Sequence, residues 1–391
     1  MKVKTAKRLD QVQEYYFSTK LKQIAQMRAE GINVINLGIG SPDIAPSSAT
    51  IDALVNAAQK KENHAYQSYV GIPSLRKAFA TWYEQFFGVT LNAENEILPL
   101  LGSKEGIMHI SMTFLETGDE VLVPNPGYPT YRSASLLAGA TVIEYNLNEE
   151  NAWLPDLEEL QKQDLSKVKL MWVNYPHMPT GAKANVNFFE KLRDFSLKNN
   201  ILIVNDNPYA FILNEHPLSI FCVEGMKEIA LELNSLSKSH NMAGWRVGML
   251  AGNPELLANV LRFKSNMDSG MFLPVQLAAI QALSSSASWY SDLNLIYKKR
   301  QLKVFEILET IGCTYDTDQT GMFVWAKIPS KYQDSYQLSD IILNGSGVFI
   351  TPGGIFGSQG NRYIRIALCA DEQIFQEALS LIQKINLNTN L

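Results

Sequence analysis

The feature that most constrains the fold of this chain is an alternation of short apolar segments with helical ones, which starts at about residue 46. The apolar segments are rich in Val, Ile and Leu, and the clearest are 120–123, 141–145, 170–174 and 201–205. Strands of this composition are buried on both faces, whereas amphipathic helices cover a sheet from outside. The pattern therefore predicts an α/β fold with a mostly parallel sheet between layers of helices.

The pattern changes after about residue 285. A long helical segment, roughly 286–311, precedes 322–326 and 363–367, which have the composition of strands in a separate α+β unit. A chain of 391 residues is expected to form two or three domains. We predict a large domain over residues 46–285 and a small C-terminal domain over residues 286–391. The N-terminal segment, residues 1–45, is expected to pack with the small domain.

Charge and cysteine content exclude several classes of function. A net charge of −5 argues against nucleic acid or an anionic membrane as the main partner. No apolar stretch approaches the roughly 20 residues that span a bilayer. Cys222, Cys313 and Cys369 are far apart in the chain, as in a reduced cytoplasmic protein. The histidines form no metal-binding motif, so we expect no metal site.

One lysine has unusual neighbours. Lys238 lies among small hydroxyl residues in the segment 235–239, has no acidic residue within five positions, and precedes Arg246 in a glycine-flanked turn. A desolvated or cation-flanked amine has a depressed pKa and can form a Schiff base with a carbonyl compound. A loop lysine beside a glycine-rich turn is the plainer interpretation of this segment alone.

Polar residues also follow the predicted strands. Asp206 ends the segment 201–206, Asn174 ends 170–174, and Ser103 follows the apolar run 98–101. Ligands of open parallel sheets bind beyond the carboxyl ends of the strands, so these side chains are candidates for one site. Tyr209, three residues after Asp206, could reach the same ligand. An Asp at such a position is about as often a turn residue.

The segment 102–106, Gly-Ser-Lys-Glu-Gly, is a candidate anion site at the start of a helix. Free backbone N–H groups and the helix dipole favour a phosphate there, although a plain N-cap explains Ser103 as well. The spacing is not that of a Walker loop. The glycines at 38 and 40 lack the third glycine of the dinucleotide fingerprint, which argues against a nicotinamide or flavin site.

Two arginines lie in the alternating segment 362–367. Arg362 and Arg365 are three positions apart and therefore face opposite sides of a strand. One of them is expected to be a solvated residue of the sheet. The other could offer its planar fork to a carboxylate.

Taken together, these segments resemble the class I and II pyridoxal-phosphate aminotransferases of fold type I, over about residues 15–385. The resemblance is carried by 37–43, 66–76, 102–106, 124–129, 179–181, 206–209, 235–248 and Arg365. It implies a large domain with a mostly parallel, seven-stranded-type sheet and a smaller α+β domain from both chain ends. It also implies ping-pong transfer of an amino group from an L-amino acid to a 2-oxo acid, with pyridoxal 5'-phosphate as cofactor.

The resemblance implies a role for each residue around the cofactor ring. Lys238 would form the Schiff base and move the α-proton of the substrate. Asp206 would keep the pyridine nitrogen protonated, Tyr209 would hydrogen-bond the phenolic oxygen, and Tyr128 would stack on the ring.

The resemblance also implies how the phosphate and the substrate are bound. The residues expected to hold the phosphate are Ser103, Lys104, the backbone of Glu105, Ser235 and Arg246. Tyr66 would reach the phosphate of a neighbouring subunit, which implies a homodimer with shared active sites. Arg365 would bind the substrate α-carboxylate, with the backbone of Gly38 nearby.

One position departs from the family pattern. The family usually has Asn immediately before Pro-Thr-Gly, where its amide donates to the phenolic oxygen, but this chain has Met178. A thioether cannot donate a hydrogen bond. Asn174 or His177 would therefore substitute, or Tyr209 would act alone.

Two other functions share some of these motifs. A β-eliminating lyase of the same fold would use the same cofactor site. A non-catalytic effector-sensing module of a transcription regulator would carry an added DNA-binding domain, and the early start of the family pattern opposes it.

The sequence does not identify the substrate, and aspartate, alanine, methionine, aromatic and diaminopimelate-type amino acids all stay open. A second carboxylate would need another cation, for which Arg262 and Lys264 are candidates that a solvated helix face explains as well. Tyr15, Tyr16 and Phe17 could instead line a pocket for a larger apolar side chain. Packing of the N-terminal helix explains these three residues equally well.

Overall fold

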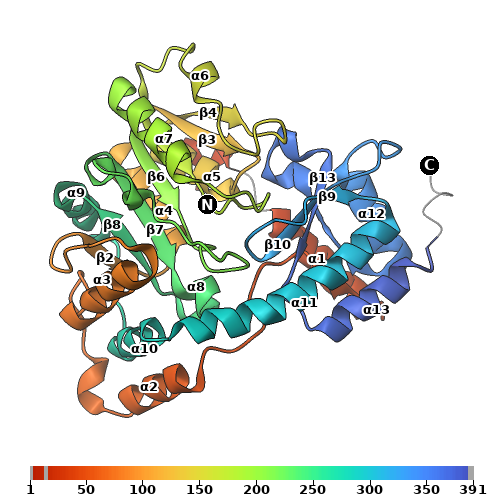
Figure 1. Cartoon of the computed structure of the whole chain (residues 1–391), viewed down its shortest axis with the longest axis horizontal. Coiled ribbons are helices and arrows are strands. Elements are labelled where there is room, and N and C mark those ends of the chain that lie inside the picture. Colours follow the sequence, from red (N-terminus) through yellow and green to blue (C-terminus); the bar gives the residue numbers. More distant parts are fainter. Residues whose placement is uncertain (1–2, 13–15, 386–391) are drawn as a thin grey trace.

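The computed structural model describes residues 3–12 and 16–385, and a seven-stranded sheet lies at its centre (Figure 1). In spatial order, its strands are β2 (Ile97–Leu100), β8 (Gly248–Gly252), β7 (Ala230–Ser235), β6 (Leu202–Asp206), β5 (Val168–Val173), β3 (Glu120–Asn125) and β4 (Thr141–Asn146). Strand β8 runs antiparallel to both of its neighbours, and every other adjacent pair is parallel. The expected mostly parallel sheet of seven strands is confirmed.

Helices cover both faces of this sheet, as the alternating sequence predicts (Figure 1). The helices of this part of the chain are α2 (Ser48–Ala58), α3 (Pro73–Phe87), α4 (Ser103–Phe114), α5 (Pro129–Ala138), α6 (Leu157–Leu160), α7 (Val186–Asn199), α8 (Leu236–Ser239), α9 (Pro254–Lys264) and α10 (Leu273–Leu283). Within the described ranges, no helix has the length and apolar character needed to cross a bilayer.

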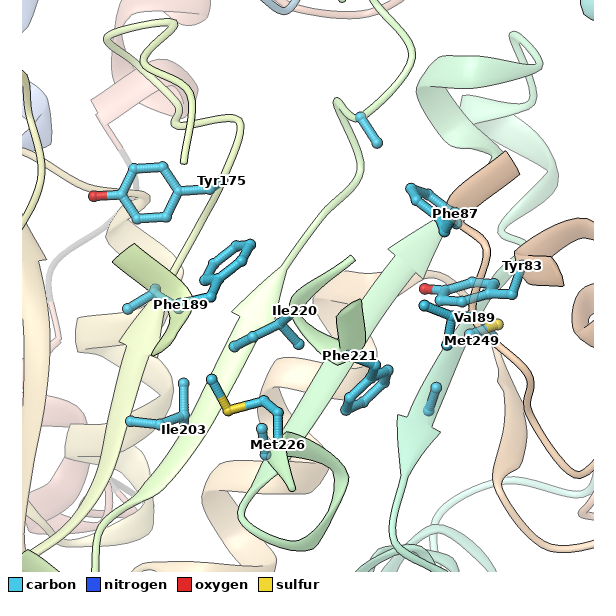
Figure 2. Packing of buried hydrophobic residues seen from close by; sticks show 14 of the residues in the cluster. Tyr83, Phe87, Val89, Tyr175, Phe189, Ile203, Ile220, Phe221, Met226 and Met249 are labelled. Carbon is cyan, nitrogen blue, oxygen red and sulfur yellow. The ribbon is translucent and has the colours of Figure 1, made fainter. Parts of the chain in front are cut away.

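Successive strand residues supply two separate hydrophobic cores. Ile203 of β6 packs in a cluster with Tyr83 and Phe189, whereas its neighbour Val204 packs on the opposite face with Ile107. Both β6 residues are fully buried, as expected where side chains alternate between two covered faces. Figure 2 shows the first of these cores, in which aromatic rings and Met side chains from several elements converge.

The C-terminal unit has its own four-stranded sheet (Figure 1). In spatial order, the strands are β12 (Thr351–Pro352), β13 (Tyr363–Ala367), β10 (Phe323–Lys327) and β9 (Thr314–Tyr315). Its helices are the long α11 (Ala287–Ile311), α12 (Ser335–Ser346) and α13 (Glu372–Ile382). All of its neighbouring strands are antiparallel, as expected for an α+β unit.

The N-terminal segment lies against this C-terminal unit. Helix α1 (Tyr16–Ala29) leads to β1 (Ile35–Asn36), which pairs in parallel with β11 (Val348–Phe349). The chain then crosses to α2, which packs against α10 (Figure 1). The domain boundaries at residues 45 and 285 stay predictions.

Candidate functional site

A cavity of about 740 Å³ collects most of the candidate residues. The candidates that line it are Ser103, Lys104, Tyr128, Asn174, Asp206, Tyr209, Ser235, Lys238, Arg246 and Arg365. All of them except Arg365 lie at or just beyond the ends of strands of the large sheet. Arg365 comes from β13, so the cavity lies between the large sheet and the C-terminal unit.

Lys238 reaches the cavity because α8 starts directly after β7. The Ser235 side chain caps this short helix. The Lys238 Nζ atom donates a 2.7 Å hydrogen bond to the carbonyl of Gly40. Burial lowers the pKa of Lys238, and the positive charges of Arg365 and Arg246 lower it further. A larger fraction of this amine is therefore uncharged and nucleophilic than of an exposed lysine.

Asp206 is a buried carboxylate with one free acceptor. The Tyr131 hydroxyl donates a 2.8 Å hydrogen bond to Oδ2. Within the described residues, Oδ1 has no hydrogen-bond partner. Burial raises the pKa of Asp206 to about 7, and the negative charge of Glu232 acts in the same direction. A buried acceptor without a donor is unfavourable, so Oδ1 fits a ligand that presents an N–H group.

The opposite end of the cavity fits a phosphate. Helix α4 begins at Ser103, where its first backbone N–H groups are available to an anion. Gly102 has a φ of 93°, and a Cβ atom there would lie 2.2 Å from Nη2 of Arg246. Only glycine therefore lets the guanidinium approach this turn. Ser235 and Ser237 add hydroxyl groups to the same cavity.

These two ends match the groups of pyridoxal phosphate. Its pyridinium N–H would meet the free acceptor of Asp206, and its phosphate would meet Arg246 and the start of α4. Its aldehyde carbon needs an uncharged amine, and Lys238 supplies one in the same cavity. The residues present therefore fit this cofactor.

Arg365 is the arginine of its strand that faces the cavity. Its Nη2 atom donates to the Gly38 carbonyl at 2.7 Å, and its Nη1 atom lies 3.3 Å from Sδ of Met178. The guanidinium carbon is 3.9 Å from the ring centroid of Phe323 and 4.6 Å from that of Phe356. A fork held in one orientation by these contacts suits a planar carboxylate.

Arg362, on the opposite face of the segment, has a different role. Its guanidinium donates to the backbone carbonyls of Tyr332 and Pro329 and so holds the loop after β10. The expectation of one solvated and one ligand-facing arginine is thus modified, because Arg362 is engaged with the backbone.

Three side chains near Met178 could supply the hydrogen-bond donor that its thioether lacks. Asn174 lines the cavity, but its amide N–H donates to the Asp206 carbonyl and its oxygen accepts from the Met178 backbone at 2.8 Å. His177 does not line the cavity, and its Nδ1 atom lies 2.8 Å from Oγ1 of Thr180. Tyr209 is therefore the remaining candidate, because it lines the cavity and its hydroxyl can donate a hydrogen bond.

Three other expected residues lie outside the cavity lining. The Glu105 side chain accepts a 2.6 Å hydrogen bond from the Leu101 backbone, so only its own backbone can serve a phosphate. The carbonyl of Gly38 accepts from Arg365. Tyr66 is 91% exposed in this chain.

Several contributors to the site were not predicted. Tyr131 lies three residues after Tyr128 on α5, and this helical spacing could have indicated that both rings face one ligand. Gly40 is in a segment that the resemblance already included. Phe323 and Phe356 had no such signal, because apolar residues of this kind usually belong to a core.

Among the described candidates for the substrate side chain, Arg262, Lys264 and Tyr16 are not part of the cavity lining. Arg262 donates to Asn259 on the surface of α9, and Lys264 is buried against Asp268. Tyr16 packs edge-on against Tyr336. Tyr15 and the side chain of Phe17 lie outside the described part of the structure.

Three potential metal ligands form a separate cluster. Donor atoms of Glu105, His109 and Asp268 lie within 4.8 Å of one another. The Nζ atom of Lys264 lies 2.9 Å from Asp268 Oδ2, so an ammonium group already occupies the place of a cation. We therefore assign no metal to this cluster.

Comparison with known proteins agrees with this geometry. Residues 32–382 match the family model described as aminotransferase class I and II. An LL-diaminopimelate aminotransferase of Dehalococcoides mccartyi is 42% identical over 375 residues, covering 95% of this chain and 96% of the relative. The substrate-bound structure of BacF from Bacillus subtilis has a TM-score of 0.94 and 35% identity, covering 99% of this chain and 98% of that one.

A further solved structure, a probable N-succinyldiaminopimelate aminotransferase from Thermus thermophilus, has a TM-score of 0.87 and 30% identity. The alignment covers 94% of this chain and 99% of that one.

The raised pKa of Asp206 predicts a pH-dependent stability in the protein without cofactor. The pKa of about 7 lies above the roughly 3.9 of an unfolded Asp. The contribution of this carboxyl to stability is therefore complete below about pH 4 and is lost as the pH rises toward about 7. Urea unfolding at several pH values in this range measures the effect. The free energy of unfolding of the wild type should fall by on the order of a few kcal/mol relative to that of Asp206→Asn. A difference that does not change with pH would contradict the burial argument.

Met178→Asn should lower the pKa at which the visible absorbance of the cofactor-loaded protein changes. The amide of Asn would stabilise negative charge on the phenolic oxygen of the cofactor, so that a proton near this oxygen would be held less tightly. The expected shift is a few tenths to about one pH unit, measured by spectrophotometric titration. Met178→Leu is the matched control and should leave the titration where it is. No shift in Met178→Asn would show that another donor already compensates, and an equal shift in both variants would show that the change does not come from the amide.

Proposed function

Because the chain belongs to the class I and II aminotransferase family, we propose that Lys238, Asp206 and Arg365 carry out amino transfer in the cavity. The chain is a pyridoxal-phosphate-dependent aminotransferase that exchanges amino groups between amino acids and 2-oxo acids. The observation that supports this assignment is the meeting of these three side chains, from three separate elements, in one cavity. Together, Lys238 supplies the nucleophilic amine, Asp206 the acceptor for the ring nitrogen, and Arg365 the fork that binds a carboxylate.

In this proposal the cofactor is held at its two ends. Ser103, Ser235 and Arg246 bind the phosphate, and Asp206 accepts the ring N–H through Oδ1. When bound, pyridoxal phosphate supplies an electron-withdrawing ring that stabilises negative charge at the substrate α-carbon. Asp206 stabilises the protonated ring nitrogen because a negative charge nearby raises the pKa of that nitrogen.

Lys238 moves the proton. Its Nζ atom is uncharged more often than that of an exposed lysine, because burial and the nearby arginines lower its pKa. It can therefore take the α-proton of the substrate as a general base and return a proton as a general acid. The 2.7 Å hydrogen bond to the Gly40 carbonyl keeps the amine at the cavity wall rather than in solvent.

Arg365 orients the substrate. A carboxylate bound to its fork fixes the α-carbon relative to Lys238, which converts proton transfer into a reaction between positioned groups. The rings of Phe323 and Phe356 hold the guanidinium in place and exclude water from it. An ion pair in a dry environment of this kind is stronger than one at the surface.

We further propose a homodimer. Tyr66, at 91% exposure, is accompanied by other large exposed side chains, Tyr69 (43%), Met267 (51%) and Phe272 (43%). The two loops that carry them are in contact, since a Cβ atom at Gly270 would lie 2.5 Å from the Gln67 carbonyl. Large exposed side chains that gather on neighbouring loops favour a protein partner. A cytoplasmic location is also proposed and rests on the three free cysteines.

The substrate named for the relatives is LL-diaminopimelate, which makes it a candidate substrate of this chain. A lyase of the same fold would release ammonia from the amino acid. An aminotransferase would instead deliver the amino group to a 2-oxo acid. Analysis of the products for ammonia against a new amino acid separates the two reactions.

Lys238→Ala should abolish amino transfer. Loss of the amine removes both the covalent attachment of the cofactor and the proton-transfer group, and the latter alone is worth about 10²–10⁴ in rate. Turnover with an amino acid and a 2-oxo acid should fall at least this far, and the visible absorbance of the bound cofactor should change. Lys198→Ala, on the exposed face of α7, is the control and should behave as wild type. Turnover near the wild-type rate in Lys238→Ala would overturn the assignment.

Met267→Glu should weaken self-association if the exposed loops form the dimer interface. A buried, unpaired carboxylate would oppose the apolar contact. Sedimentation equilibrium should show a dissociation constant raised at least about tenfold, the equivalent of about 1.4 kcal/mol. Leu295→Glu on α11, where the native side chain is 63% exposed, is the control. A monomeric wild-type protein, or an unchanged Met267→Glu dimer, would rule out this interface.

A further inference from the structure

A second carboxylate, that of Glu232, is fully buried in the large sheet and lies outside the cavity lining. Glu232 is on β7, in register with Asn205 of β6. Its β7 neighbours Leu231 and Leu233 pack on one face of the sheet, so alternation directs Glu232 to the other face. The proposed function, on which this inference rests, gives this buried charge no role.

Hydrogen-bond donors surround the Glu232 carboxylate. The Tyr83 hydroxyl donates to Oε1 at 2.9 Å, and the backbone N–H of Ile220 donates to Oε2 at 2.9 Å. Tyr83 and Ile220 both belong to the core drawn in Figure 2. Burial raises the pKa of Glu232, and its hydrogen bonds oppose the rise because they stabilise the ionised form. The Cys222 thiol also faces Glu232, and burial raises the pKa of this thiol to about 11, so it stays uncharged.

The other donors to Glu232 come from the two residues that flank Asp206. Nδ2 of Asn205 donates to Oε2 at 2.9 Å, and Nδ2 of Asn207 lies 3.5 Å from the same oxygen. Asn205 also accepts a 3.1 Å hydrogen bond from the backbone of Tyr175, which follows β5. Glu232 therefore holds the end of β6 at the residue before Asp206 and at the residue after it.

The charge of Glu232 also acts on Asp206. Burial is the main cause that raises the pKa of Asp206, and the negative charge of Glu232 raises it further. The other titratable groups that interact with Asp206 in the described ranges are three hydroxyls, those of Tyr128, Tyr131 and Tyr209. Burial raises the pKa of each hydroxyl, so all three stay uncharged at neutral pH. Glu232 is therefore the source of negative charge to which Asp206 responds.

We propose that Glu232 is a positioning residue of the site, which holds Asp206 through the two flanking asparagines and whose charge keeps the ring nitrogen of the cofactor protonated. Loss of the ring proton would leave the charge of Asp206 unbalanced beside that of Glu232, and two like charges in a protein interior repel strongly. The protonated ring is the form that withdraws electrons from the substrate. Glu232 thus acts on the reaction through Asp206 and touches neither cofactor nor substrate.

Glu232→Gln tests the charge in the protein without cofactor. The fold should be retained, because the amide oxygen can accept from the Ile220 backbone and the amide N–H can donate to the Tyr83 hydroxyl. In the wild type, the stabilising contribution of the Asp206 carboxyl is lost as the pH rises from about 4 toward about 7. Without the negative charge of Glu232 the folded pKa of Asp206 is lower, so this loss should end at least about half a pH unit earlier.

Urea unfolding between pH 4 and 8 measures this range, with each protein compared with its own Asp206→Asn counterpart. Glu120→Gln is the matched control, because Glu120 starts β3 at the end of the sheet opposite the cavity, and it should leave the range unchanged. Glu232→Asp keeps the charge and should keep the wild-type range. A wild-type range in Glu232→Gln would overturn the inference. So would a lowered range in Glu232→Asp, whether or not Glu232→Gln folds.

The cofactor-loaded protein tests the effect on the reaction. On mixing with LL-diaminopimelate or glutamate, Glu232→Gln should lose its visible absorbance at least about threefold more slowly than the wild type, and Glu232→Asp should recover most of the rate. An equal rate in Glu232→Gln would overturn the inference and leave amino transfer intact. A wild type that reacts with no amino acid would instead overturn the proposed function, and the urea experiment would still measure the action of Glu232 on Asp206.

Discussion

The site depends on the way the segment 37–43 bridges two parts of the molecule. On one side, the carbonyl of Gly38 accepts a 2.7 Å hydrogen bond from Arg365 of the C-terminal unit. Two residues later, the carbonyl of Gly40 accepts a 2.7 Å hydrogen bond from Lys238 of the large sheet. A few residues of extended backbone thus set the spacing between the amine and the carboxylate-binding fork. The backbone carbonyls also supply acceptors for two largely buried nitrogen donors.

Other contacts fix the position of the segment 37–43, so it can set the spacing between Lys238 and Arg365. Arg300 of α11 makes a bidentate pair with Asp43, at 2.7 and 2.8 Å, and also donates to the carbonyl of Leu368. At the other end, the backbone N–H of Ala367 donates to the Leu37 carbonyl at 2.7 Å. Bidentate contacts of Arg fix geometry as well as charge. The positions of Lys238 and Arg365 therefore follow from the packing of the whole molecule and not from their own short elements.

The sequence predicted most of the fold because the periodicity of buried strands and amphipathic helices is strong. It missed two strands of the large sheet. In β7 the polar residues Glu232 and Asn234 interrupt the apolar run, and in β8 Gly248 and Gly252 enclose a run of only three residues, which leaves little pattern to detect. The alternation alone also could not choose between Arg362 and Arg365, and only the resemblance to the family pointed to Arg365. Alternation places the two on opposite faces, but only the tertiary structure decides which face meets the cavity.

The candidate site was predictable where residue type and position coincided, as for Asp206 at the end of its strand. The two rings around Arg365 were not predictable, because Phe323 and Phe356 are apolar residues in an apolar region. Their role follows from the guanidinium that lies between them. Met178 was visible as a departure from a motif, but its contact with Arg365 required the structure.

The central claim is that Lys238 is the amine that holds the cofactor. Borohydride reduction of the cofactor-loaded protein makes that linkage permanent, and peptide mass spectrometry then identifies the modified lysine. The account predicts that the modification is found on Lys238, in near one-to-one proportion with the bound cofactor. A modification on Lys104, the other lysine that lines the cavity, or no stable modification at all, would contradict it.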